Sequence, residues 1–216
     1  MKKVWNKKEK GEMGIGTLII FIAMIIVAAV AATVLIQTAY QLQQQAEETG
    51  NIAIQDVATG FKIIHVGGIV DNSTPSAPKV GIIQIKVGLI AGSPAIDMRN
   101  VLIELTDGTK DVTLNYTNVD ITTTAGQVKL AATGEWLANT TFTAKILRDM
   151  PPQNWDNQRV VTQGDIVMLI INATAAGLNL TPQSQVTLQI IPKHGVPTYA
   201  AFMVPATLTT KYVDLY

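Results

Sequence analysis

Two patterns of hydrophobic residues divide the chain. Residues 18–36 form an apolar run, LIIFIAMIIVAAVAATVLI, in which Thr33 is the one polar residue among nineteen. No proline interrupts residues 13–59, and glutamine and glutamate follow the run, so the sequence predicts one helix of about 70 Å. Its apolar stripe would continue through Ile52, Val57, Phe61 and Ile64. Gly50-Asn51 marks the place where we expect any kink, and Gly60 or Gly67-Gly68 the end.

Beyond residue 60 the pattern changes to the alternation that is typical of strands with one buried face. Apolar residues alternate with polar ones over residues 83–89, 101–105 and 186–190, and the continuous apolar run 166–171 suits a central strand. Turn-forming clusters at 72–75, 92–94, 107–108 and 150–152 separate these segments. About 150 residues with many short strands predict an immunoglobulin-like β-sandwich, although the pattern does not specify the strand order.

Composition excludes several classes of protein. The 216 residues are 48% hydrophobic and 15% charged, with no cysteine and a formal net charge of zero, so the chain is neither a disordered tail nor a disulfide-stapled miniprotein. The absence of cysteine removes thiol catalysis, cysteine-ligated zinc and iron–sulfur clusters. A balanced charge also lacks the basic footprint of a nucleic-acid-binding protein, and we expect no nucleic-acid partner.

The charges are unevenly distributed. Residues 1–11 carry five lysines and one glutamate, whereas residues 13–46 carry no charged side chain. About 20 apolar residues can cross a bilayer as a helix, and lysines stay on the cytoplasmic side, so everything after about residue 40 is expected outside. A cleaved secretory signal is disfavoured because the run is long and no small-x-small site follows it. A single-pass membrane anchor is the simplest alternative.

Catalytic motifs are missing from the sequence. His65 lies among apolar residues and His194 lies in a turn-like segment, where packing or loop roles are usual. The four serines have no nucleophile elbow, and the chain has no P-loop, dinucleotide fingerprint or His-Glu-x-x-His motif. We therefore do not expect an enzyme, and we expect no cofactor.

One turn has the composition of a weak calcium candidate. Asp107 and Asp111 place two carboxylates in the turn DGTKD, but the segment lacks the spacing and the distal glutamate of an EF-hand loop. An ordinary solvated hairpin turn is the favoured interpretation. Structural Ca²⁺ at Asp107 and Asp111 is kept as a hypothesis.

Acceptor triplets for N-glycosylation suggest an exported protein. The pattern N-x-S/T occurs five times, which exceeds the one or two expected by chance, and an acceptor asparagine has to be exposed. We expect at least two of the five to be used: Asn72, Asn115, Asn139, Asn172 and Asn179.

The junction between the lysines and the apolar run resembles the start of archaeal flagellins, also called archaellins. Lys10-Gly11-Glu12 is followed by GIGTLI at residues 14–19 and FIA at residues 21–23. Precursors of that family carry a short basic leader that ends in glycine, followed by a segment of this type. Residues 195–198 and 205–216 also look like the family's final strands. The resemblance is dense over residues 10–36, weaker to about residue 60 and only compositional through the middle.

This resemblance implies a cut between Gly11 and Glu12 by a prepilin-type signal peptidase that recognises Lys8, Lys10 and Gly11. It implies three parts: a leader, 1–11; a hydrophobic helix, 12–60; and an outer β-sandwich, 61–216. Glu9 stands where the family usually has a basic residue, and Glu12 where it usually has a small one. Gly16 stands where bacterial type IV pilins typically have glutamate.

The function that the resemblance implies is that of a structural subunit of the archaeal flagellum, the archaellum, a rotated swimming filament. Its partners would be further archaellin copies or paralogues and the assembly and motor machinery. The precursor of the chain would also be held in the membrane. Small residues allow close helix packing, and the expected filament-core positions are Gly14, Gly16, Phe21, Ala28, Ala29 and Ala32. An archaeal type IV adhesion pilin and a membrane-anchored β-sandwich binding module are the alternatives.

Overall fold

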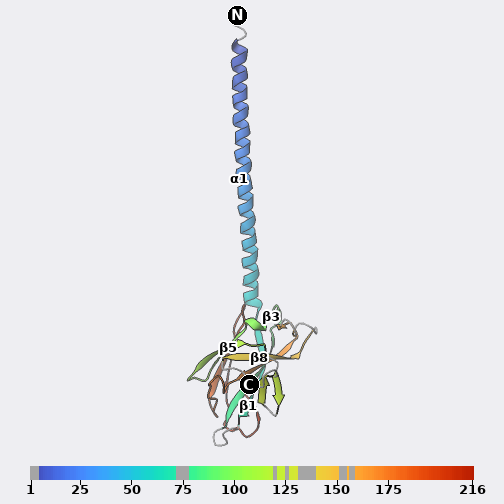
Figure 1. Ribbon diagram of the computed structural model, residues 1–216, viewed down its shortest axis with the longest axis vertical. Helices are drawn as coiled ribbons and strands as arrows, with labels where there is room; N and C mark the ends of the chain where they lie inside the picture. Colours follow the sequence, from blue (N-terminus) through green and yellow to red (C-terminus); the bar gives the residue numbers. More distant parts are fainter. Residues whose placement is uncertain are drawn as a thin grey trace. The chain divides into compact units, whose positions relative to one another are not determined.

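The computed structural model describes residues 5–71, 78–118, 121–124, 127–130, 140–150, 155 and 159–216. It divides into two compact units, Met1–Ala53 and Ile54–Tyr216. The first consists of most of one helix, and the second contains the end of that helix and all the strands (Figure 1). We call the strand-containing part, from Phe61 onwards, the β domain.

The helix α1 spans Trp5–Ala58, 54 residues without a proline. It passes through Gly50 and Asn51 without a break, because one glycine costs a helix only about 1 kcal/mol relative to alanine. Thr59 N still donates to Gln55 O at 2.9 Å, and the strands begin directly after Gly60. Of the two predicted ends, Gly60 lies two residues beyond the observed one, whereas Gly67-Gly68 lies inside the first strand. The prediction that Phe61 and Ile64 continue a helical stripe is wrong, since both lie in the first strand.

The strands are mostly short. The larger ones are β1 (Phe61–Asp71), β2 (Lys79–Leu89), β4 (Leu102–Thr106), β5 (Asp111–Tyr116), β8 (Thr141–Arg148), β10 (Ile166–Asn172), β11 (Gln185–Ile191) and β12 (Thr198–Met203). The smaller elements are β3 (Ile96–Asp97), the 3₁₀ helix η1 (Met98–Asn100), β6 (Ile121–Thr124), β7 (Gln127–Leu130), β9 (Val160–Val161) and β13 (Tyr212–Asp214). Strands β5 and β12 alternate between buried and more exposed residues, whereas β2 and β10 contain consecutive buried residues. The four segments predicted as strands from the sequence correspond to β2, β4, β10 and β11.

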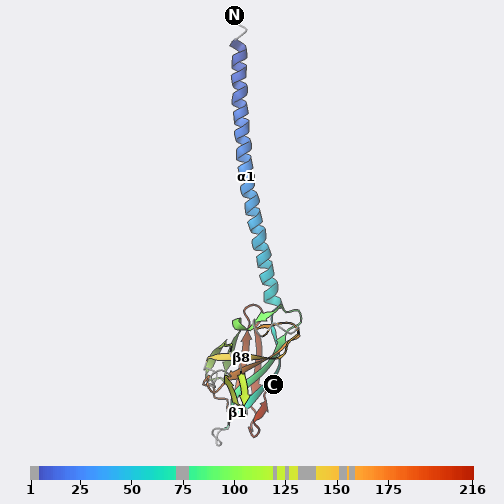
Figure 2. The ribbon, with the colours of Figure 1, turned by 45° about the vertical axis from the view of Figure 1, so that its right-hand side comes forward.

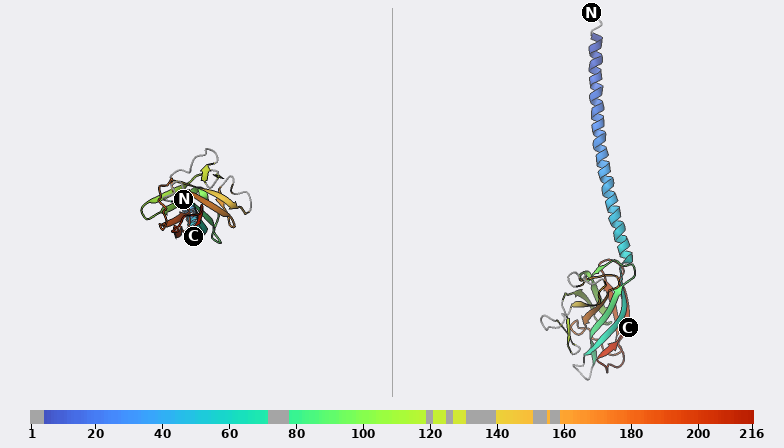
Figure 3. Two further views of the ribbon diagram at one scale, coloured as in Figure 1. Left: turned by 90° about the horizontal axis from the view of Figure 1, so that it is seen from below. Right: turned by 90° about the vertical axis from the view of Figure 1, so that its right-hand side faces the viewer.

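Nine strands form one continuous sheet in the order β12-β11-β4-β5-β8-β10-β2-β1-β13. All neighbours are antiparallel except β5 and β8, which run parallel at Asn115–Thr141 and Tyr116–Phe142. The sheet folds over on itself: Thr198 Oγ1 of the edge strand β12 donates to Phe61 O of β1 at 2.7 Å. Figures 2 and 3 show the strands wrapped around a common interior.

The core fills this interior with branched aliphatic residues. Ile83, Ile85, Ile103, Leu169 and Leu188 are completely or almost completely buried, and they belong to one cluster that includes residues from both halves of the folded sheet. A smaller cluster, Ile82 with Ile170, lies apart from it. The predicted fold class, a long N-terminal helix followed by an all-β domain, is confirmed; the two layers expected of a sandwich are halves of one curved sheet.

Candidate functional site

The apolar part of α1 is exposed around its whole circumference. Every large apolar side chain from Met13 to Ile36 is between 48% and 69% exposed, which is what an isolated helix leaves open. The segment Met13–Ala58 is long and apolar enough to cross a membrane, and none of its most apolar stretch is buried inside the chain. A helix that is apolar on all sides is stable only when something else surrounds it. This surface is therefore the main candidate functional site.

This surface carries small residues, and its threonine hydroxyls donate hydrogen bonds to carbonyls of the same helix, so it suits an environment without water. A Cβ added at Gly14 or Gly16 would meet nothing within 4 Å, and Ala28, Ala29 and Ala32 are exposed, as is Phe21. Thr17 Oγ1 donates to Gly14 O at 3.0 Å, and Thr33 Oγ1 donates to Ala29 O at 2.9 Å. The two threonine hydroxyls in this part of the helix are thus satisfied internally, as a spanning or closely packed helix requires.

The leader positions Lys8, Lys10, Gly11 and Glu12 lie on helical backbone that is continuous with the apolar run. Their side chains are outside the described part of the structure. Their roles in recognition and cleavage remain predictions.

The Asp107 carboxylate, a metal-ligand candidate, is used as a turn organiser. Its Oδ1 accepts hydrogen bonds from Thr109 N at 2.9 Å, Thr109 Oγ1 at 2.6 Å and Lys110 N at 2.8 Å. Its Oδ2 accepts from Asn179 N at 3.0 Å, which ties the β4–β5 turn to a loop 72 residues away. Partial burial raises the pKa of Asp107, but these hydrogen bonds outweigh it and hold the pKa well below its ordinary value.

Asp111, the second candidate ligand, interacts with another acid. It hydrogen-bonds with Glu104, and this bond together with like-charge repulsion raises the pKa of Glu104. Among the described residues, no group of three or more histidine or acidic side chains is arranged to hold a metal ion. Calcium binding at Asp107 and Asp111 remains a prediction, and it would have to compete with the donors that Asp107 already serves.

The described sequons differ in how free their side chains are. Asn115 on β5 and Asn179 in the loop after β10 are exposed. Asn172 is half-buried at the end of β10, and its Oδ1 accepts from Ala175 N at 3.0 Å. Asn72 and Asn139 lie outside the described residues. Steric access therefore favours Asn115 and Asn179.

Both histidines face carboxylates, which the sequence did not reveal because the partners are far away in the chain. His65 Nε2 lies 2.6 Å from Asp214 Oδ1, joining β1 to the C-terminal strand β13. His194 Nδ1 lies 3.5 Å from Asp56 Oδ1, next to the end of α1. The first pair joins β1 to the C-terminal strand and the second joins the β11–β12 turn to the end of α1, in agreement with the packing and loop roles expected.

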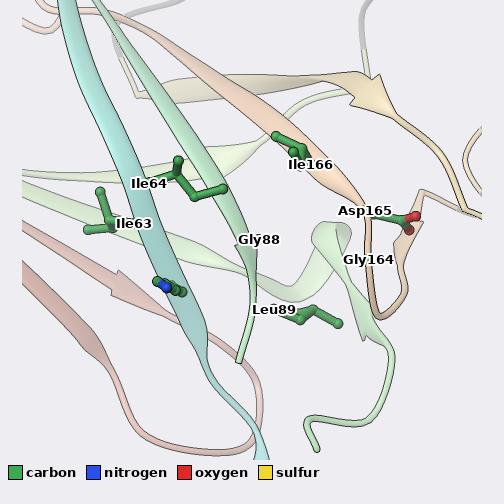
Figure 4. Close-up of a pocket in the computed structure, with 8 residues that line it drawn as sticks. Ile63, Ile64, Gly88, Leu89, Gly164, Asp165 and Ile166 are labelled. Atoms are coloured by element: carbon green, nitrogen blue, oxygen red, sulfur yellow. The ribbon is translucent and has the colours of Figure 1, made fainter. Parts of the chain in front are cut away.

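A shallow groove of about 500 Å³ lies beside β1, β2 and the start of β10 (Figure 4). Its eight lining residues include only two charged ones, Lys62 and Asp165. Asp165 is 2% exposed, and its carboxylate already accepts from Met150 N at 2.6 Å, Thr162 N at 2.7 Å and Thr162 Oγ1 at 2.8 Å. It closes a loop, and the groove offers no set of convergent reactive groups.

Comparison with known proteins gives consistent results. The profile of the archaeal-type flagellin family matches residues 11–202. Flagellin B2 of Methanocaldococcus jannaschii is 42% identical over 212 residues, which cover 96% of this chain and 95% of the relative. Flagellin B1 of the same organism is 37% identical over 215 residues, covering 97% and 96%.

Two solved structures share the fold. The crystal structure of archaeal flagellin FlaB1 from Methanocaldococcus jannaschii has a TM-score of 0.59 and 23% identity, covering 73% of this chain and 97% of that one. The archaeal flagellum of Methanospirillum hungatei strain JF1 has a TM-score of 0.65 and 16% identity, covering 94% and 98%. The first match covers only part of this chain, whereas the second covers nearly all of it.

Proposed function

The chain belongs to the archaeal-type flagellin family and is a structural protein of the archaeal flagellum rather than an enzyme; we propose that copies of it polymerise through α1. In this proposal the apolar helices of neighbouring copies surround one another in the core of an extracellular filament, and the β domains face solvent.

The observation that carries this proposal is the complete exposure of the apolar helix within one chain. Fifteen large apolar side chains between Met13 and Ile36 are roughly half exposed or more. Full burial of such a side chain contributes about 1.5–3 kcal/mol, so the helix leaves tens of kcal/mol of hydrophobic free energy to be gained outside its own chain. Burial against identical helices related by a non-closing helical operator recovers it repeatedly along a filament.

The same helix suits a membrane-held precursor. Lysines at the N-terminus keep that end in the cytoplasm, and the apolar run spans the hydrocarbon layer until assembly begins. A prepilin-type signal peptidase then cuts between Gly11 and Glu12, after recognising the leader through Lys8, Lys10 and Gly11. The freed helix passes to the archaellum assembly and motor machinery. Support for this sequence of events comes from the Lys10-Gly11-Glu12 junction and the charge-free stretch behind it.

N-terminal sequencing of assembled filaments tests the processing step. We expect the mature chain to begin at Glu12, and a Gly11→Val substitution to leave an uncut precursor in the cytoplasmic membrane. Filaments whose subunits begin at Met1, or beyond residue 36, would contradict the proposal.

Deletion of the gene separates this function from the alternatives. A polymerising flagellin predicts loss of swimming filaments, whereas an adhesion pilin predicts loss of attachment with motility kept. A membrane-anchored binding module predicts a monomer with an intact leader and unchanged filaments.

We further propose that Asn115 and Asn179 carry N-linked glycans, since both side chains are exposed in the β domain. Mass spectrometry of filament peptides should find both modified and Asn172 unmodified. Unmodified Asn115 and Asn179, in filaments that carry glycans elsewhere, would contradict this assignment.

A further inference from the structure

The edge strand β12 presents apolar side chains to the outside of the β domain. Ala200 and Phe202 are buried, whereas Tyr199 and Met203 are 65% and 61% exposed, with the exposed Ala201 between them. The preceding turn adds Val196, which is 59% exposed. An outward face of an antiparallel sheet is normally polar. We call Val196, Tyr199, Ala201 and Met203 the β12 face.

A lysine lies directly before this face. The turn 192–197 between β11 and β12 carries the exposed Lys193. The same turn is fixed to the end of α1, because Val196 N donates to Thr59 O at 3.1 Å and His194 Nδ1 lies 3.5 Å from Asp56. The β12 face therefore starts close to the end of the helix, and the last helical turns also carry the exposed Ile54 and Val57.

From Met13 onwards, α1 carries charges of only one sign. Between Met13 and Ala58 it has three acids and no lysine or arginine. Asp56 faces His194, whereas Glu47 and Glu48 are exposed and adjacent to each other. One to two turns earlier, Tyr40 and Leu42 are 63% and 66% exposed. Residues 40–48 thus combine two apolar side chains with two acids, and the β12 face is apolar and is preceded by Lys193.

We propose that residues 40–48 of one copy dock on the β12 face of a second copy, with Lys193 of the second copy between Glu47 and Glu48 of the first. The proposal rests on polymerisation through α1. A filament that grows without closing needs two different surfaces on each subunit that fit each other, and these two surfaces are complementary in both apolar character and charge. Within such a packed array of helices, Glu47 and Glu48 of one copy would repel the same two residues of neighbouring copies. Lys193 of the second copy removes that repulsion.

Charge exchange tests the contact. Lys193→Glu alone, and Glu47→Lys with Glu48→Lys, should each lower the yield of sedimentable filaments at least tenfold. The chain that carries all three substitutions should recover at least half of the wild-type yield, because attraction is restored with reversed signs. Lys145→Glu, which alters another exposed lysine on β8, is the matched control and should assemble normally.

Each result supports or contradicts the contact between residues 40–48 and the β12 face. Normal filaments from Lys193→Glu, or failure of the triple variant to recover, would overturn the proposed contact. If Lys193 instead served anionic lipid headgroups, Lys193→Glu would release the precursor from vesicles containing anionic lipid and the triple variant would not recover. Circular dichroism of detergent-extracted subunits should show an unchanged fold; if Lys193→Glu misfolds, Lys193→Ala replaces it, with a smaller loss expected.

The outcome is separable from that of the general function. If the wild-type chain itself forms no filament, polymerisation through α1 fails. If wild-type filaments form and the charge exchange has no effect, only the docking of residues 40–48 on the β12 face fails. Since the chain has no cysteine, Lys193→Cys with Glu48→Cys and a short bismaleimide gives a direct check: cross-linked dimers and ladders are expected in filaments, and monomers only would contradict the contact.

Discussion

Helix α1 and the β domain are both rich in apolar residues, yet they use them in opposite ways. In the β domain, successive strand residues alternate between a closed core and solvent, and Ile85, Ile103 and Leu188 have no exposed surface. In α1, every large apolar side chain from Met13 to Ile36 is at least 48% exposed. The β domain therefore carries its own stabilising core, whereas the stability that α1 can contribute depends on what surrounds it. Hydrophobic content alone does not say where a residue is buried.

The largest difference in unfolding free energy is expected when one leucine side chain is shortened to alanine in each region. Leu105→Ala opens a cavity in the β domain and should lower its free energy of unfolding by about 2–5 kcal/mol. Leu35→Ala removes a side chain that is 68% exposed in the single chain and should leave the unfolding of the β domain unchanged. Urea unfolding of detergent-extracted subunits, followed by near-ultraviolet circular dichroism, measures both. Equal losses would contradict the independence of the two regions.

A smaller effect, confined to the assembled state, is expected from enlarging the helix surface. Ala29→Leu adds bulk where helices are proposed to meet, and overfilling a close-packed interface costs about 1–3 kcal/mol per site. Membrane insertion and cleavage after Gly11 should be normal, because lipid tolerates the added methylenes. Electron microscopy should show short or absent filaments, whereas Ile36→Val assembles. Full-length motile filaments built mainly from Ala29→Leu would mean that Ala29 does not lie in a tight interface.

The polar contacts of the β domain predict that its stability depends on pH. Hydrogen bonds hold the pKa of Asp107 below its ordinary value of 3.8, so their stabilising effect is present above about pH 4 and is lost as the pH falls further. Asp107→Asn should cost about 1 kcal/mol at pH 7, the net worth of a typical hydrogen bond, and much less near pH 2. Thermal unfolding at both pH values tests this; an equal loss at both would contradict the ionised role.

The smallest expected effect has the opposite sign. A hydrogen bond with Asp111 and repulsion by the negative charge of Asp111 both raise the pKa of Glu104. The folded protein therefore binds the proton of the Glu104 carboxyl better than the unfolded chain does. Stability is therefore gained when the pH falls and is lost as it rises through the raised pKa. Glu104→Gln should melt slightly higher than the wild type at pH 7 and equally near pH 4. A lower melting temperature at pH 7 would show that the pair is held by another group.

The sequence predicted the parts of the fold whose signals are local. Alternation over residues 186–190 identified β11, since one face of that strand is buried and the other is open. The first strand was missed because Phe61 and Ile64 are three residues apart, a spacing that also fits a helix, and because Gly67 and Gly68 lie inside β1. The order of the nine strands depends on pairings between distant segments and has no local signature.

The candidate site likewise has parts that the sequence predicted and parts that it did not. The apolar helix and its small residues are visible in the sequence because they form one continuous run without charged side chains. The anchoring of Asp107 by Asn179, and of His65 by Asp214, could not be predicted, since 72 and 149 residues separate the partners and only the folded sheet brings them together. The β12 face was missed because Tyr199 and Met203 alternate with buried residues and look like an ordinary strand.

The central claim is that α1 is enclosed by other copies whereas the exposed side of β5, in the β domain, stays in solvent. The cysteine-free chain allows a direct measurement: maleimide labelling of Val27→Cys, on α1, and of Thr113→Cys, on the exposed side of β5, in intact filaments and after dissociation in detergent and urea. We expect Thr113→Cys to react in both states and Val27→Cys to react only after dissociation. Labelling of Val27→Cys in intact filaments at the rate of Thr113→Cys would contradict the account.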